Sequence, residues 1–282
     1  MTIAFIGLGN MGAPMSALLV GAGHVVRGFD LSEPARQALV SAGGTAASSL
    51  EDALRDASTV ILMLPNSDVV ERVVTEAEFA PDSVVIDMSS SEPLRTRALA
   101  ASLQQRGVTL VDAPVSGGVA RARTGELTIM TGGTPPDLAR VEPILACLGT
   151  TVRAGEVGAG HAVKALNNLM SATHLLVTSE AMLAGERFGL DPAVMLSIFN
   201  SSSGRSGSTE NKWPNFILPE TYDSGFGLRL MLKDMRIAAG LAAEMGTPDP
   251  LGGAAVGLWA QAAEVLDAGA DHTEIVNWLR KD

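Results

Sequence analysis

The first residues whose spacing suggests chemistry are glycines near the N-terminus, in the run Gly7-Leu8-Gly9-Asn10-Met11-Gly12. This G-x-G-x-x-G pattern follows a β-branched stretch at 3–6 and precedes a predicted helix at 11–20. The first glycine permits a tight turn, the second lets a pyrophosphate approach the backbone, and the third lets helix and strand pack closely. Amides at the helix N-terminus then face the anion. In this context the run predicts a dinucleotide site, and a purely structural turn is the alternative.

A carboxylate, Asp30, ends the second predicted strand. At this distance from a glycine loop, a carboxylate hydrogen-bonds the 2′-hydroxyl of an adenosine ribose and repels a 2′-phosphate. Leu31 supplies no cation that would attract the phosphate, so the sequence favours NAD over NADP. In the alternative interpretation Asp30 caps the next helix, a role that Ser32 can fill equally well.

Two further loops lie at the ends of buried strands of the same predicted sheet. Leu64, Pro65 and Asn66 follow the strand that begins at Thr59, and Ser90 follows the strand at 84–87. Ligands of open α/β sheets bind outside the carboxyl ends of the strands, so we expect these residues to contact the cofactor. Capping of the helix near residue 93 is the alternative role of the serine.

A lysine and an asparagine, Lys164 and Asn168, lie four residues apart near the start of a long predicted helix at 161–188. This spacing puts both on one helix face. The helix dipole, together with desolvation in a closed cleft, would lower the pKa of Lys164, as general acid–base chemistry near neutral pH requires. Asn168 can hold a substrate oxygen or orient the amine. On spacing alone, a solvated lysine is the better-supported alternative.

A third candidate segment combines a hydroxyl with glycine amides at Ser116, Gly117 and Gly118. Such a group can bind a carboxylate as a nest, and a glycine turn before the strand at 127–131 is the alternative. We interpret the nearby Arg121 and Arg123 as solvated surface residues. The four histidines and the single cysteine show no metal-ligand spacing, so we assign no metal site.

The composition excludes several classes of function. A chain of 282 residues, 46% of them hydrophobic, can bury a sizeable core. The formal net charge of −11 makes nucleic acids and acidic membranes poor partners. One cysteine indicates a reducing compartment, the N-terminus lacks the basic region of a signal peptide, and no apolar run approaches the roughly 20 residues of a membrane span. We therefore expect a soluble cytoplasmic protein.

The elements that position these residues divide the chain in two. Short β-branched runs alternate with helical periods in the first half, which predicts a doubly wound α/β sheet, mostly parallel, with some antiparallel pairing near 127–130. The second half is predicted to be all-α, with a Ser- and Gly-rich loop at 200–209 and a last helix at 273–280. The predicted domains are residues 1–160 and 161–282, and the junction includes a Gly-rich hinge at 154–160.

Four separated motifs occur in order along the chain, at 5–15, 112–118, 158–168 and 233–234. They read Phe-Ile-Gly-Leu-Gly-Asn-Met-Gly-Ala-Pro-Met, Asp-Ala-Pro-Val-Ser-Gly-Gly, Gly-Ala-Gly-His-Ala-Val-Lys-Ala-Leu-Asn-Asn and Lys-Asp. Together they resemble the signatures of the β-hydroxyacid dehydrogenases, the family of 3-hydroxyisobutyrate dehydrogenase. The resemblance implies a Rossmann domain that binds NAD, an all-α C-terminal domain, a substrate cleft between them and a catalytic lysine on the interdomain helix.

The resemblance also implies a role for each matched residue. Lys164 takes the hydroxyl proton of the substrate as a hydride leaves its carbon, and returns a proton to the carbonyl oxygen in reduction. Asn168 binds the substrate, and the segment 116–118 holds its acid group. Lys233 reaches the cofactor or closes the cleft with Asp234 as its structural partner, and an exposed Lys–Asp pair is the alternative.

The sequence thus predicts an NAD-dependent enzyme that interconverts a small 3-hydroxy acid and its semialdehyde or keto acid. The alternatives are a same-fold reductase of an imine, a sulfonated aldehyde or a sugar-acid aldehyde, and a non-catalytic NAD-binding scaffold. The loop at 200–211 lacks an aromatic residue soon after Arg205, which leaves the identity of the hydroxy acid open. Apolar helices in the second half predict a homodimer or homotetramer.

Overall fold

The computed structural model describes residues 2–280 and contains two compact units, Met1–Lys164 and Ala165–Asp282. The division falls after Lys164, inside the long helix α8 (Ala159–Phe188), and not after residue 160. The hinge expected at 154–160 is short, because strand β9 (Gly149–Gly155) continues into it and α8 begins four residues later. Only residues 156–158 connect the strand to the helix.

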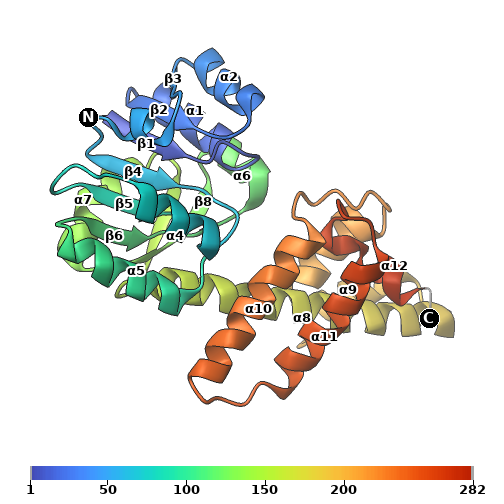
Figure 1. The fold of residues 1–282 in the computed structure, drawn as a ribbon. Coiled ribbons are helices and arrows are strands. Elements are labelled where there is room, and N and C mark those ends of the chain that lie inside the picture. The colour runs from blue at the N-terminus through green and yellow to red at the C-terminus, as the bar shows by residue number, and fades with distance from the viewer. Residues whose placement is uncertain (1, 281–282) are drawn as a thin grey trace. The chain divides into compact units, whose positions relative to one another are not determined.

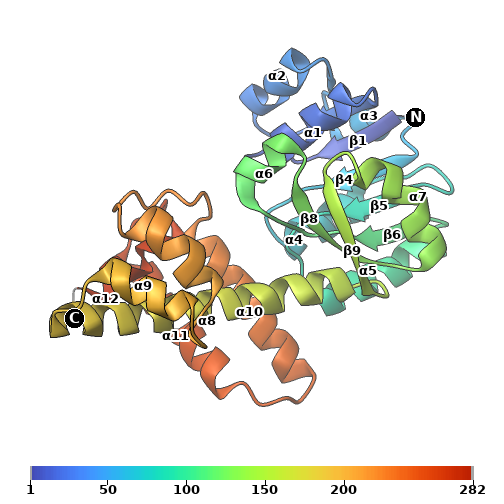
Figure 2. The same cartoon turned by 180° about the vertical axis from the view of Figure 1, so that it is seen from behind.

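Within residues 2–280, nine strands form one sheet in the first unit (Figure 1). Besides β9 they are β1 (Thr2–Ile6), β2 (Val25–Phe29), β3 (Thr45–Ala46), β4 (Thr59–Leu62), β5 (Val84–Asp87), β6 (Thr109–Asp112), β7 (Val115–Ser116) and β8 (Leu127–Gly132). The order β3-β2-β1-β4-β5-β6 is parallel throughout, and β8 runs antiparallel to β6 and β7. The predicted Rossmann sheet, including its antiparallel part near residue 127, is confirmed. The view from behind shows β8 and β9 side by side (Figure 2), and these two strands pair in parallel.

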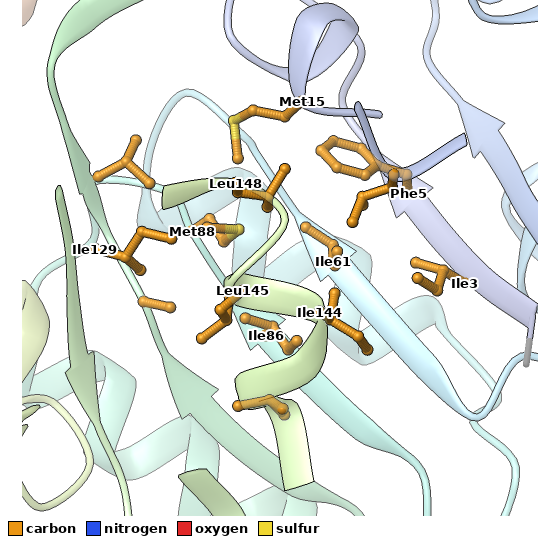
Figure 3. Close-up of a cluster of buried hydrophobic side chains, with 14 of the residues drawn as sticks. Ile3, Phe5, Met15, Ile61, Ile86, Met88, Ile129, Ile144, Leu145 and Leu148 are labelled. Carbon is orange, nitrogen blue, oxygen red and sulfur yellow. The ribbon is translucent and has the colours of Figure 1, made fainter. Parts of the chain in front are cut away.

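Both faces of the sheet are covered by helices, and the side chains of each central strand alternate between two buried clusters. The helices of this unit are α1 (Gly12–Gly21), α2 (Glu33–Ser41), α3 (Leu50–Leu54), α4 (Ser67–Glu76), α5 (Pro93–Gln105), α6 (Gly118–Thr124) and α7 (Pro135–Leu145). Ile3 and Phe5 join the cluster under α1 and α7 (Figure 3), whereas Ala4 and Ile6 join the cluster on the opposite face. Burial on both faces explains why these strands read as continuous apolar runs.

The second unit is all-α. It contains most of α8 together with α9 (Pro192–Asn200), the π-helix η1 (Ser208–Ile217), α10 (Leu228–Glu244), α11 (Pro250–Val265), the short 3₁₀ turn η2 (His272–Glu274) and α12 (Ile275–Leu279). Trp213 and Trp259 are the largest side chains of its core, and both are fully buried. None of the helices described for residues 2–280 is long and apolar enough to cross a membrane.

Two details of the second unit differ from the prediction. The loop expected at 200–209 ends before Ser208, where η1 begins, because Trp213 and Ile217 bury this segment in the core. The single helix expected at 273–280 is split into η2 and α12, since the Asp271 carboxylate forms a capping box with Glu274 and starts a 3₁₀ turn there.

Candidate active site

The glycine loop lies between β1 and α1. A Cβ on Gly12 would stand 1.9 Å from the carbonyl oxygen of Gly7, so only glycine allows the helix to begin this close to the strand. Gly9 is exposed, and a Cβ there would meet nothing within 4 Å. The backbone at Gly9 is therefore open to a pyrophosphate, while Gly7 and Leu8 are buried. This cradle fits a dinucleotide.

Asp30 follows β2 and is tied to the glycine loop. Its carboxylate accepts hydrogen bonds from Leu8 N at 2.7 Å and from Ser32 N at 2.8 Å. Ser32 itself caps α2, since its hydroxyl accepts from Ala35 N. The capping role thus belongs to Ser32, and the Asp30 carboxylate lies beside the loop, where the ribose interpretation needs it.

One cation near Asp30 was missed by the sequence argument. The guanidinium of Arg36, on α2, donates to the main-chain oxygens of Asp30 and Leu31. Arg36 lies beyond residue 31 in sequence, but the first turn of α2 brings it back toward the strand end.

The loops after β4 and β5 lie at adjacent strand ends, because β1 pairs with β4 and β4 pairs with β5. Leu64 N donates to Ser89 Oγ at 2.9 Å, which joins the two loops. Asn66 caps α4 by accepting from Val69 N at 3.0 Å. The loops that contain Leu64, Pro65, Asn66 and Ser90 thus lie at the carboxyl ends of the parallel strands, where the glycine loop also lies. Contact of these residues with a cofactor stays a prediction.

A buried aspartate, Asp112, connects β6 to the first turn of α8. One carboxylate oxygen accepts from Gly158 N at 2.6 Å and the other from His161 N at 2.9 Å. Burial raises the pKa of the Asp112 carboxyl above its ordinary value, although the electrostatic interaction with His161 and the hydrogen bonds from these two amides oppose the shift. Asp112 belongs to one of the four motifs but was assigned no function from the sequence. Asp112 lies at the end of a strand and shortly before the Gly-rich segment that leads into α6, and this position was the signal that could have marked it as a site residue.

Lys164 and Asn168 lie on successive turns of α8, with only 7% and 5% of their surfaces exposed. Asn168 Nδ2 donates to Asp234 Oδ2 on α10 at 2.6 Å, and Asn168 Oδ1 accepts from the neighbouring amide of Asn167. The carboxylate of Asp234 also pairs with Lys233 Nζ at 3.2 Å. Asp234 is buried, so the exposed Lys–Asp pair is excluded. Its bond to Asn168 was missed by sequence reasoning.

The predicted carboxylate nest lies between β7 and α6. Ser116 ends β7, and Gly117 and Gly118 both have positive φ, +132° and +69°. The side chain of Arg121 packs across Gly117, where a Cβ would stand 2.8 Å from Arg121 Cδ. Arg121 and Arg123 are exposed. Binding of a substrate acid group by this segment stays a prediction.

Comparison with known protein families assigns both units. Residues 2–158 match the model of the NAD-binding domain of 6-phosphogluconate dehydrogenase, and residues 158–279 match the model described as NAD-binding of NADP-dependent 3-hydroxyisobutyrate dehydrogenase. The chain belongs to the β-hydroxyacid dehydrogenase family.

Individual β-hydroxyacid dehydrogenases resemble the chain over almost its whole length. The NAD-dependent L-serine dehydrogenase of Pseudomonas aeruginosa is 39% identical, over 91% of this chain and 90% of that protein. The 3-sulfolactaldehyde reductase of Escherichia coli is 35% identical, over 99% and 95%. A solved structure of Mycobacterium tuberculosis 3-hydroxyisobutyrate dehydrogenase with L-serine has a TM-score of 0.94 at 35% identity, over 99% of each chain.

As a β-hydroxyacid dehydrogenase, this protein is an oxidoreductase of hydroxy acids whose first unit is an NAD(P)-binding domain. The family models and relatives include both NAD-dependent and NADP-dependent enzymes, and they act on different hydroxy acids.

Proposed function

We propose that this protein oxidises a small 3-hydroxy carboxylate to its semialdehyde with NAD, using Lys164 as the general base. The observation that carries the proposal is the buried pair of Lys164 and Asn168 on successive turns of α8, with Asn168 held by Asp234. A buried amine close to the N-terminus of a helix suits proton transfer better than a solvated lysine does.

The nicotinamide cofactor, when bound, supplies the hydride acceptor. Lys164 Nζ accepts the proton of the substrate hydroxyl, and in the reverse direction the lysine returns a proton to the carbonyl oxygen. Asn168 holds the substrate oxygen. Its Nδ2 donates to the Asp234 carboxylate, which limits the rotation of the amide before the substrate arrives. Ser116 and the amides of Gly117 and Gly118 bind the carboxylate of the substrate.

The proposed preference for NAD rests on Asp30. Its carboxylate lies beside the glycine loop, where it can accept from a ribose hydroxyl and would repel a 2′-phosphate. The guanidinium of Arg36 donates to main-chain oxygens in the same segment. That bonding supports a structural role for Arg36, although a cation at this place also weakens the repulsion of a 2′-phosphate.

The proposed substrate class draws on the relatives. One is an L-serine dehydrogenase and another structure contains L-serine, so compounds of three or four carbons with a carboxylate and a 3-hydroxyl are favoured. The 3-sulfolactaldehyde reductase, whose sequence identity to this chain is similar to that of the serine dehydrogenase, is named for a sulfonated substrate.

A substrate panel tests the proposal. The purified protein is assayed for reduction of NAD and of NADP with L-serine, 3-hydroxyisobutyrate, glycerate and a hydroxysulfonate of the same chain length. We expect turnover of at least one carboxylate, with a higher kcat/KM for NAD than for NADP. Turnover of the sulfonate alone would contradict the substrate class, and binding of NADH without any turnover would favour the scaffold alternative.

A further inference from the structure

A buried histidine, His161, lies three residues before Lys164 in the first turn of α8 and is 1% exposed. Its Nε2 atom lies 3.0 Å from the main-chain oxygen of Ser89. A carbonyl oxygen can only accept, so Nε2 carries a hydrogen and donates it to Ser89. Its Nδ1 atom lies 2.9 Å from Thr96 Oγ1 on α5. Both ring nitrogens therefore contact the segment that follows β5.

Two buried carboxylates flank this imidazole. Asp87 Oδ2 lies 3.8 Å from Nε2, and Asp112 Oδ2 lies 4.0 Å from Nδ1. The Asp87 carboxylate accepts from Ser89 N and from Ser91 Oγ, which shapes the loop after β5. The Asp112 carboxylate accepts from the amides of Gly158, just before α8, and of His161, in its first turn. The two carboxylates thus hold the two segments that His161 connects.

The loop on the far side of His161 belongs to the predicted cofactor site. Ser89 Oγ accepts from Leu64 N, so the loops after β4 and β5 are joined at the same residue whose carbonyl oxygen contacts His161. A ligand that orders these loops also orders the partner of His161. Because His161 lies one turn before Lys164, that ordering reaches the turn that carries the lysine.

We propose that His161 is a positioning residue that couples occupancy of the dinucleotide site to the order of the α8 turn carrying Lys164. The inference rests on the proposed function in one respect, that the loops after β4 and β5 bind the cofactor. Gly160 allows the turn to pack this tightly, because a Cβ there would stand 2.2 Å from the main-chain oxygen of Met130. The coupling requires a side chain that can donate to Ser89, and a packed apolar group cannot replace it.

Hydrogen–deuterium exchange of the segment 158–168, with and without NADH, tests the coupling. In the wild-type protein NADH should slow exchange of this segment by about fivefold or more. The variant His161→Leu should lose this NADH-dependent difference and have a lower kcat. The variant His161→Gln should keep most of the NADH-dependent difference and most of kcat, because its amide can donate to the main-chain oxygen of Ser89 from near the position of Nε2.

Two further variants make the result decisive. Glu180 lies exposed on the same helix, and Glu180→Gln should behave as wild type. The isosteric Thr96→Val removes one of the two ring contacts and should reduce the NADH-dependent difference, which keeps the test open if His161→Leu does not fold. Faster exchange in His161→Leu with an unchanged NADH-dependent difference would mean a purely structural role and would overturn the proposal, as would His161→Gln behaving like His161→Leu.

The exchange measurement is independent of turnover. NADH-dependent protection without oxidation of any hydroxy acid would contradict the proposed function and leave the coupling standing. Turnover without NADH-dependent protection would contradict the coupling and leave the proposed function standing.

Discussion

Lys164 is the residue on which turnover depends in the proposed reaction. Replacement by alanine removes the proton acceptor, so we expect kcat/KM to fall by about 10² to 10⁴ while NADH binding changes little. Steady-state assays and titration of NADH fluorescence measure the two quantities. The variant Lys164→Arg keeps the positive charge but cannot lose a proton near neutral pH, and it should be equally impaired. Turnover at a comparable rate in Lys164→Ala would show that another group is the base.

Asp30 is the residue on which the proposed preference for NAD depends. In Asp30→Ser the carboxylate no longer repels a 2′-phosphate or accepts from a ribose hydroxyl, so the ratio of kcat/KM for NADP to that for NAD should rise about tenfold or more. The matched control is Ser32→Ala, which removes the cap of α2 without touching the ribose position. An unchanged ratio in Asp30→Ser would remove the basis of the NAD preference.

At the level of elements, the start of α8 depends on close packing against the sheet. A Cβ on Gly160 would stand 2.2 Å from Met130 O and 2.8 Å from Asp112 Oδ2. Gly160→Ala should therefore lower the free energy of unfolding by about 1–3 kcal/mol, which urea denaturation measures. In α11 a Cβ on Gly257 would meet nothing within 4 Å, so Gly257→Ala should raise the free energy of unfolding by about 0.5–1 kcal/mol. Equal effects of the two changes would contradict the packing argument.

The helices and strands that the sequence predicted well have strong local signals. The strand at 84–87 and the long helix at 161–188 agree with the structure, because β-branched runs and helical hydrophobic periods are local patterns. Strand β9 and the π-helix η1 were missed. β9 is recruited by pairing with β8, and η1 is held by the burial of Trp213, and both causes depend on residues distant in sequence.

For the molecule as a whole, His272 predicts how stability depends on pH. Burial, followed by the charge of Lys212, lowers the pKa of His272 to about 4, whereas in the unfolded chain it is near 6.5. The folded state therefore binds fewer protons between these values, so stability is complete above about pH 6.5 and is lost as the pH falls toward 4. The loss attributable to this group is about 3 kcal/mol.

Urea denaturation across this pH range checks the prediction. His272→Asn should flatten the pH dependence, although it also lowers stability at neutral pH because the bond to the main-chain oxygen of Phe226 changes. Gly257→Ala, which changes no titratable group, should leave the slope of the profile unchanged. Identical slopes in wild type and His272→Asn would rule out this histidine as the cause.

Assembly is the last property at this scale. Val163, Leu166, Met170 and Val177 form an exposed apolar stripe along one face of α8. We propose that a second copy of the chain covers it in a homodimer or homotetramer. Light scattering should give a multiple of 29.1 kDa, and Met170→Glu should reduce the mass toward that of the monomer. Val25→Glu, at an exposed position in β2, should not. A monomeric wild type would contradict the proposal.

The sequence by itself determined the family, the type of fold and the residues that could do chemistry. Glycine spacing, hydrophobic period and the four motifs are local patterns, and local patterns can be read along a chain. Only the tertiary structure decided which buried polar groups meet. Asp112 holds amides 46 and 49 residues away, and Asp234 holds an amide 66 residues away. Such pairs are set by strand order and helix packing, because every buried polar group needs a partner and the fold decides which one is near.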